Sequence, residues 1–269
     1  MDYTLTEINI YPVKSLGGIS LNEAEVTDRG LKYDRRWMLV DDSGKLLTQR
    51  VLPQMSLIKT SLDNHSLCFN HKLNPHLRYA VKLEGGSGER KEVVVWDDTV
   101  DAVSVGKDAD SWFSEALGFK CRLVYMPEDS KRYVDTKYSS GNEIVSFADA
   151  YPFLVIGQPS LDDLNSRLNE KLPMNRFRPN FVFVGGKPFD EDKIKSFNLN
   201  NVTFFPVKPC ARCVVTTVNQ DTGIKGKEPL EILASYRTQN NKVMFGQNLL
   251  HKGTGIIKKG SKLENIEWK

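Results

Sequence analysis

The sequence predicts a mainly β protein with some α-helix, in which two β-rich domains pack against each other. Short runs of β-branched and aromatic residues follow one another at regular turn spacing up to about residue 105, which is typical of a small barrel or sandwich. Similar buried runs continue through the second half, where short helical patterns interrupt them. Because no repeat, low-complexity segment or soft linker separates the halves, packed domains are favoured over tethered ones.

The first half is expected to be built from short strands joined by tight turns. The expected strands are, in order, Thr4–Ile10, Glu23–Thr27, Arg35–Asp41, Leu46–Gln49, Arg78–Leu83 and Glu92–Trp96. Asp42-Ser43-Gly44 predicts a hairpin turn between the third and fourth of these strands. The glycine-rich Gly85-Gly86-Ser87-Gly88 predicts a second hairpin turn between the last two strands. It is not expected to bind a phosphate, because no helix follows whose N-terminus could cradle one.

A helix and a long polar loop are expected in the middle of the chain. The helix should run from about Asp110 to Leu117 and end at Gly118 in the C′ position. The segment from Met126 to Glu143 is polar and without periodicity, and a loop of this length in a compact protein is usually functional or disordered. Since it lies shortly before Asp149, we treat it as a candidate lid.

The second half is expected to alternate between buried strands and short helices. The expected strands are Phe153–Ile156, Phe181–Val184, Val202–Val207, Phe245–Asn248 and Gly253–Ile257. Ser160 is predicted to cap a helix. Its core stripe would consist of Leu161, Leu164, Leu168 and Leu172. Pro229 is expected at N1 of a further short helix.

Composition and charge exclude several classes of protein. The net charge of +3 and the absence of long basic runs do not indicate a nucleic-acid partner. The N-terminus shows no signal peptide, and no apolar run approaches the roughly 20 residues of a membrane span. Cys68 and Cys121 are isolated, so a disulfide framework is not expected. We therefore expect a cytoplasmic protein that binds neither membrane nor nucleic acid.

The first candidate for a metal-binding or catalytic site is the cysteine pair of Pro209-Cys210-Ala211-Arg212-Cys213. Structural zinc needs four ligands, whereas this is a single pair and the four histidines show no ligand spacing. A redox dithiol needs a helix N-terminus, whereas the β-branched run Val214–Val218 favours a strand. Buried structural cysteines and a thiolate ligand or nucleophile remain open. Of the two, Cys213 is predicted to be the better ligand, because it would begin the strand while Cys210 follows a proline.

A second candidate is a set of cations at the ends of expected strands. Arg35 and Arg36 should face opposite sides of their strand, so that only one of them can enter a given cavity. Together, Lys14, Arg35, Arg178 and Arg212 could line a pocket for an anion, because lysine and arginine suit phosphate recognition.

Taken in order, these motifs resemble those of the MOSC family, with the MOSC N-terminal β-barrel domain in front, and are most similar to the mitochondrial amidoxime-reducing component and its bacterial relatives. The motifs are Tyr11-Pro12-Val13-Lys14-Ser15, Asp34-Arg35-Arg36-Trp37, Leu47-Thr48-Gln49-Arg50, Phe147-Ala148-Asp149, Arg176-Phe177-Arg178-Pro179-Asn180, Pro209–Cys213 and Phe245-Gly246-Gln247-Asn248. The resemblance covers nearly the whole chain. It implies an N-terminal MOSC β-barrel domain at residues 1–120 packed on a MOSC β-barrel domain at residues 121–269.

The resemblance implies a bound molybdenum cofactor, whose metal is held by a pterin dithiolene with a terminal phosphate. It assigns Cys213 as the metal ligand and, together with Asp149, as a catalytic residue. The residues it implies for cofactor binding are Lys14, Ser15, Arg35, Asp149, Ala150, Tyr151, Arg178, Ala211, Arg212 and Asn248. Asp149 is interpreted as a hydrogen-bond acceptor near the metal or pterin, and a role as general acid is a further hypothesis.

The activity implied by the resemblance is the reduction of N-hydroxylated compounds such as amidoximes. Some relatives carry a ferredoxin-like domain with four cluster-binding cysteines, which this chain lacks, so electrons would come from a separate flavin, heme or iron–sulfur protein. A non-enzymatic carrier of the cofactor, or of sulfur as a persulfide on Cys213, is the alternative. A β-barrel protein that binds another phosphorylated ligand is a third hypothesis.

Overall fold

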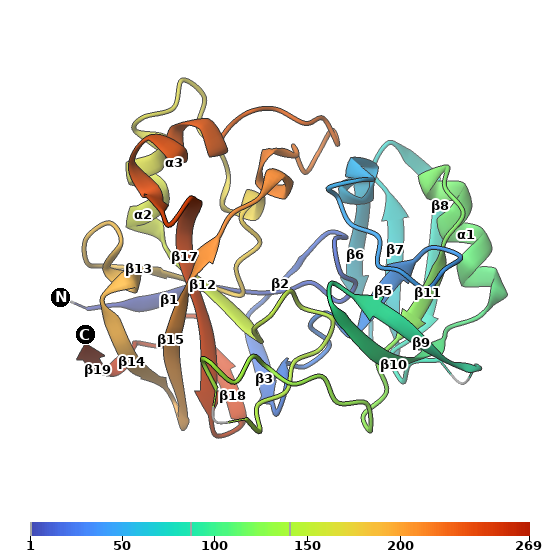
Figure 1. The fold of residues 1–269 in the computed structure, drawn as a ribbon, viewed down its shortest axis with the longest axis horizontal. Coiled ribbons are helices and arrows are strands. Elements are labelled where there is room, and N and C mark those ends of the chain that lie inside the picture. Colours follow the sequence, from blue (N-terminus) through green and yellow to red (C-terminus); the bar gives the residue numbers. More distant parts are fainter. Residues whose placement is uncertain (1, 87, 140) are drawn as a thin grey trace.

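The computed structural model describes residues 2–86, 88–139 and 141–269, and it consists of two β-rich bodies that lie side by side (Figure 1). One body is formed mainly by residues 37–125, and the other by residues 3–31 together with residues 153–268. Strands dominate both bodies and helices are short. The predicted mainly β fold with some α-helix and two packed β-rich parts is confirmed.

The largest sheet forms the framework of the second body. Its strands are, in spatial order, β19 (Glu264–Trp268), β14 (Ile194–Leu199), β15 (Val202–Ala211), β17 (Lys242–Lys252), β12 (Phe153–Gly157), β13 (Phe181–Val184), β1 (Thr4–Ile10) and β2 (Ile19–Leu21), with β16 (Thr238–Gln239) attached to β17. Strands β12 and β13 run parallel, and β1 pairs antiparallel with β13, Ile8 opposite Phe181. The start of the chain therefore completes a sheet made mostly of C-terminal strands.

Three smaller sheets complete the fold. Their strands are β18 (Gly255–Lys258), β3 (Glu23–Thr27) and β4 (Gly30–Leu31); β5 (Trp37–Val40), β11 (Arg122–Tyr125), β10 (Asp98–Ser104) and β9 (Arg90–Val95); and β6 (Ile58–Leu62), β7 (Ser66–His71) and β8 (Asn74–Lys82). Strand β3 pairs with β18, and β11 pairs with β5, so each body includes strands from both sides of residue 120. The domain boundary expected there stays a prediction.

The helices cover apolar surfaces of the sheets. Helix α1 (Lys107–Leu117) ends at Gly118 with a left-handed φ of 59°, as expected for a glycine C-cap, and it packs Phe113 against Phe69 of β7. Helices α2 (Gln158–Asn165) and α3 (Leu230–Arg237) cover one core of the second body. Across the described ranges no helix has the length and apolarity that would cross a membrane. The cytoplasmic location stays a prediction.

The hairpin expected across Gly85–Gly88 is wrong. Strand β8 pairs with β7, whereas β9 pairs with β10, so the two flanking strands belong to different sheets. Ser87 itself lies outside the described residues. The segment expected as the strand Leu46–Gln49 makes an isolated bridge between Leu46 and Val40 instead of forming a named strand. Short apolar runs predict strands here, but long-range pairing chooses their partners.

Two helix starts and one strand start also differ from expectation. Ser160 lies inside α2, whose N-cap is Gly157, and its hydroxyl donates instead to the buried Glu191 carboxylate at 2.8 Å. Pro229 occupies the N-cap rather than the N1 position of α3. Arg35 precedes its strand with a left-handed φ of 50°. Each difference arises because a tertiary contact or a turn overrides a local preference.

Candidate functional site

A cleft of about 660 Å³ is lined by residues of both bodies. Every residue that the sequence singled out as a site residue lines it, although these residues come from separate stretches of the chain. They are Lys14, Ser15, Arg35, Asp149, Ala150, Tyr151, Arg178, Ala211, Arg212, Cys213 and Asn248. The fold thus gathers the whole set around one cavity, in which a small ligand could be enclosed.

Lys14 and Asp149 form an ion pair in the cleft. The Lys14 ammonium, whose side chain is 6% exposed, lies 2.5 Å from Asp149 Oδ1, and it also donates to the Phe147 carbonyl at 2.8 Å. Trp96 Nε1 donates to the same Oδ1 at 3.3 Å. The Asp149 side chain is 75% exposed to the open cleft; the partial desolvation there would raise its pKa, but the Lys14 ammonium, with Arg35 and Arg50, holds the pKa well below its usual value. Asp149 is therefore a carboxylate and accepts hydrogen bonds, which opposes a general-acid role.

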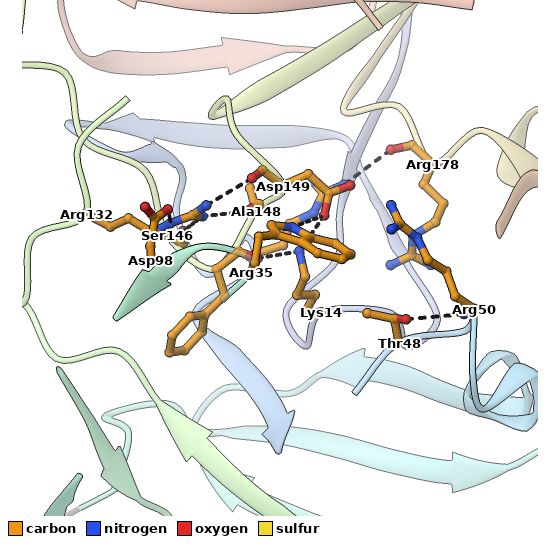
Figure 2. Close-up of polar contacts among 12 residues, drawn as sticks. Lys14, Arg35, Thr48, Arg50, Asp98, Arg132, Ser146, Ala148, Asp149 and Arg178 are labelled. Atoms are coloured by element: carbon orange, nitrogen blue, oxygen red, sulfur yellow. Dashed lines mark hydrogen bonds and ion pairs between the residues drawn. The ribbon is translucent and has the colours of Figure 1, made fainter. Parts of the chain in front are cut away.

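Arg132 holds the backbone that carries Asp149 (Figure 2). Its buried guanidinium donates to the carbonyls of Ser146 at 3.2 Å, Ala148 at 2.5 Å and Asp149 at 3.0 Å. Its Nε donates to Asp98 at 2.7 Å. The described residues of the segment 126–143 thus contain no helix or named strand, as expected, but the segment is fastened to the site through Arg132. A lid role for its remaining described residues stays a hypothesis.

Arg35 and Arg178 approach the same tyrosine ring. Their guanidinium carbons lie 4.4 Å and 4.2 Å from the centre of the Tyr11 ring. Arg35 is paired with the buried Asp34 carboxylate at 2.6 Å, whereas Arg178 donates to the Leu16 carbonyl at 2.6 Å. Burial, together with the nearby Arg35 charge, lowers the pKa of Arg178 to about 10. These two neighbouring cations favour an incoming anion.

Several residues that line the cleft have left-handed backbone conformations that non-glycine residues rarely adopt. The φ angles are 69° at Ser15, 50° at Arg35, 57° at Arg178 and 58° at Trp96. Such a conformation costs about 1–2 kcal/mol per residue, so it persists only where surrounding contacts impose it. Strain of this kind concentrated around one cavity is a mark of a functional site.

The strand expected after the cysteine pair is wrong. Strand β15 ends at Ala211, and Val214–Thr217 form a 3₁₀ helix with Cys213 in the N-cap position. The buried Arg176 donates to the carbonyls of Thr216 and Thr217, both at 2.9 Å, so these groups need no neighbouring strand. The sequence-based reason for preferring Cys213 therefore does not hold, because that residue does not begin a strand.

The structure distinguishes the two cysteines in another way. Cys210 Sγ accepts a hydrogen bond from Arg212 Nη1 at 2.9 Å and packs beside the core that contains Phe177. Cys213 Sγ has no hydrogen-bond partner within the described part of the chain. Arg212 also donates to the Phe177 carbonyl at 2.5 Å, while its buried Nε has no partner among those residues. Cys213 is therefore the sulfur that remains available in the cleft.

Several residues that line the cleft were not identified as site residues from the sequence. Arg50 stacks on Trp96 at 4.3 Å from the ring centre, and Lys137 and Tyr138 come from the long polar loop. Arg36, in contrast, donates to Glu128 and Met126 instead of lining the cleft. Arg50 belongs to one of the recognised motifs, but a hairpin tryptophan such as Trp96 carries no local signal of function.

Within the described ranges, no group of three or more histidine, cysteine or acidic side chains is placed to hold a metal ion. A metal bound by Cys213 would therefore need its other ligands from a non-protein group. The surrounding cations would favour a ligand that carries negative charge.

Comparison with known proteins matches each half of the chain to a domain model of the same family. Residues 2–120 match the MOSC N-terminal beta barrel domain, and residues 142–264 match the MOSC domain. The mitochondrial amidoxime-reducing component 1 of Mus musculus is 33% identical over 275 residues, covering 96% of this chain and 80% of its own. The Homo sapiens protein of that name is 31% identical, covering 96% and 81%. A molybdenum cofactor sulfurase of Oryza sativa is 34% identical over 91% of this chain, which spans only 32% of that relative's length.

Proposed function

Because the chain belongs to the MOSC-domain family, with a MOSC N-terminal domain preceding the MOSC domain, we propose that it binds the molybdenum cofactor in the cleft and reduces N-hydroxylated compounds. The observation that carries the proposal is the convergence of all predicted site residues on one cavity. Relatives named amidoxime-reducing components, which this chain matches over most of both lengths, support the reaction class.

The chemistry of the donor set fits this cofactor. Lys14, Arg35 and Arg178 line the cleft together with Arg212, whose buried Nε lacks a partner among the described residues. These groups would hold the anionic pterin phosphate, with Ser15 and the Asn248 amide as neutral hydrogen-bonding groups and the Ala150, Tyr151 and Ala211 segments beside it. When bound, the cofactor supplies a metal centre that takes up electrons and removes oxygen from the substrate.

Cys213 would provide the protein ligand to molybdenum as a thiolate, because soft metals prefer sulfur. Its lack of a hydrogen bond within the described part of the chain leaves the sulfur available for a metal, whereas Arg212 already engages Cys210. Cys210 is assigned to packing.

Asp149 would orient the substrate. Lys14 and Trp96 both donate to Oδ1, so Oδ2 is the oxygen left to accept a hydrogen bond from an N–H or O–H group. Because Lys14 keeps this carboxylate ionised, its contribution is positioning and charge, and the protons for water formation would come from solvent. Electrons would come from a separate donor protein that carries flavin, heme or an iron–sulfur cluster.

The proposal is tested by producing the protein in cells supplied with molybdate, measuring bound molybdenum and assaying benzamidoxime with a reduced viologen dye. We expect about one molybdenum per chain and reduction to benzamidine. Absence of molybdenum together with a different ligand in the cleft would contradict both the cofactor and the reaction.

The cysteine pair offers matched variants. Cys213→Ser should lose most of the activity because it removes the soft ligand, while Cys210→Ser should retain it. Full activity in Cys213→Ser would disprove the ligand assignment.

The similarity to the rice sulfurase supports a second candidate, a carrier that holds sulfur as a persulfide on Cys213 without turnover. Molybdenum without benzamidoxime reduction, together with cyanide-labile sulfur that disappears in Cys213→Ser, would favour the carrier. Turnover without such sulfur would favour the reductase.

A further inference from the structure

One group of side chains in the cleft is assigned neither to the cofactor phosphate nor to the ordering of Asp149, although the backbone segment of one member, Tyr151, is placed beside the cofactor. Lys208 of β15 extends over the rings of Tyr138 and Tyr151, with its ammonium 4.6 Å and 5.8 Å from their centres. The two rings meet edge to face with their centres 6.2 Å apart. All three residues line the cleft, as does the neighbouring Lys137. We call these four residues the Lys208 cluster.

The Lys208 cluster contains hydrogen-bond donors and positive charge that nothing in the described structure uses. Tyr151 is 6% exposed, yet its hydroxyl has no hydrogen-bond partner among the described residues. Burial raises the pKa of Tyr151, so this hydroxyl keeps its proton and can donate. Lys208 has no carboxylate within salt-bridge distance in the described ranges, and a buried hydroxyl left without a partner is costly. The Lys208 ammonium and the Tyr151 hydroxyl are therefore both donors that an incoming acceptor could engage.

The acidic side chain whose charge acts on Tyr151 does not neutralise this cluster. Asp135 acts on Tyr151 from the long loop, but its carboxylate is exposed and accepts the Lys137 backbone N–H at 3.0 Å. The charges of Lys137 and Lys208 therefore exceed that of Asp135. Because Lys137 is exposed and Tyr138 is half-buried, the cluster borders the opening of the cleft, where a substrate would enter.

We propose that Lys208 and Tyr151 form an anion subsite that binds a carboxylate or phosphate group of the substrate, so that the enzyme selects anionic N-hydroxylated compounds over neutral ones. This inference rests on the proposed function and names the substrate class of the same cleft. A lysine ammonium beside a neutral phenol offers a charged and a neutral donor to one oxyanion. The aromatic rings of Tyr138 and Tyr151 hold the ammonium in place through cation–π contacts.

The test compares benzamidoxime with 4-carboxybenzamidoxime, which differ by a single carboxylate. We expect kcat/KM to favour the carboxylated compound by about tenfold at low salt, and the preference to shrink toward parity at about 0.5 M salt. Lys208→Gln should reduce the preference to about twofold or less, and Tyr151→Phe, which keeps the ring, should reduce it about threefold.

Lys195→Gln is the matched control, because Lys195 is an exposed lysine of β14 that pairs with Glu267 at 3.1 Å and does not line the cleft. It should leave the preference at the wild-type value. An unchanged preference in Lys208→Gln would overturn the proposal. A loss of bound molybdenum in Lys208→Gln would also overturn it, because the anion would then be the phosphate of the cofactor.

Equilibrium binding separates this proposal from the proposed function. Calorimetry with the oxidised protein measures the affinity of both compounds without turnover. A binding preference that depends on Lys208, in a protein that reduces neither compound, would support the subsite and contradict the reductase. Reduction of both compounds without any preference would support the reductase and contradict the subsite.

Discussion

Replacement of Arg132 by methionine is expected to lower the free energy of unfolding by about 3 kcal/mol. Arg132 is 6% exposed, and its guanidinium donates to three carbonyls of the segment that ends at Asp149. Lys14 contacts this segment as well, through the Phe147 carbonyl and the Asp149 carboxylate. Two buried cations thus fix the backbone that presents Asp149 to the cleft.

The magnitude follows from which acceptors lose their partner. The carbonyls of Ser146 and Ala148 belong to buried residues, and a buried carbonyl without a partner costs about 1–3 kcal/mol. The Asp98 carboxylate is 50% exposed and can be hydrated again, so it adds little. Methionine keeps most of the apolar stem, so little packing is lost. Two orphaned carbonyls at about 1.5 kcal/mol each, in the lower half of that range, give the value of about 3 kcal/mol.

The assay is chemical and thermal unfolding followed by circular dichroism. A loss of about 3 kcal/mol should lower Tm by roughly 6–12 °C in a chain of this size. Lys131→Met is the control, because Lys131 is the exposed neighbour, and it should unfold as the wild type does. In the reductase assay, Arg132→Met should lower kcat more than it raises KM, because Asp149 loses its fixed position.

A loss below about 1 kcal/mol at an unchanged m-value would show that the carbonyls find other partners, and it would refute the role assigned to Arg132 in holding this segment. A drop of equal size in Lys131→Met would refute the assignment to buried hydrogen bonds.

Three further predictions follow from single buried positions. Burial raises the pKa of the Glu191 carboxyl from 4.5 to about 7, so between these pH values the folded state keeps a proton that the unfolded state has lost. The free energy of unfolding should therefore fall as pH rises from 4.5 to 7. Glu191→Gln should remove this dependence, as measured by urea unfolding at pH 4.5 and 8. Gly246→Ala should cost about 2–3 kcal/mol in the same assay, because φ is 80° and a Cβ would lie 2.7 Å from Ile156 Cγ1. Arg176→Met should cost about 2 kcal/mol and lower the molybdenum content, because it frees the 3₁₀ helix that Cys213 begins.

Each of these predictions has an outcome that contradicts it. A wild-type pH profile in Glu191→Gln would mean that this carboxyl is ionised in the folded protein. An unchanged midpoint in Gly246→Ala would show that Ile156 can move aside. Wild-type stability and metal content in Arg176→Met would show that the 3₁₀ helix is held by its own hydroxyl bonds.

Local signals in the sequence located many of the elements. The alternating run Thr4–Ile10 is a strand with the expected bounds, and Gly118 ends α1 in the left-handed conformation that glycine permits. The run Val214–Val218 is β-branched but begins a 3₁₀ helix, because Arg176 and the hydroxyls of Thr216 and Thr217 satisfy its carbonyls. Strand propensity describes a side chain that fits a sheet, and within the described ranges this run pairs with no named strand and makes only the isolated bridge between Val218 and Lys225.

The sequence by itself determined the fold class, the family and many of the residues that line the cleft, because a hydrophobic pattern and a motif are properties of neighbouring residues. Only the tertiary structure brought Lys14 to Asp149 across 135 positions and placed a strand from the start of the chain in the C-terminal sheet. Only the fold also showed that Arg212 engages Cys210 rather than Cys213, and that Trp96 and Arg132 hold Asp149. Such contacts join residues distant in sequence, and their energies depend on burial and geometry that a local pattern does not encode.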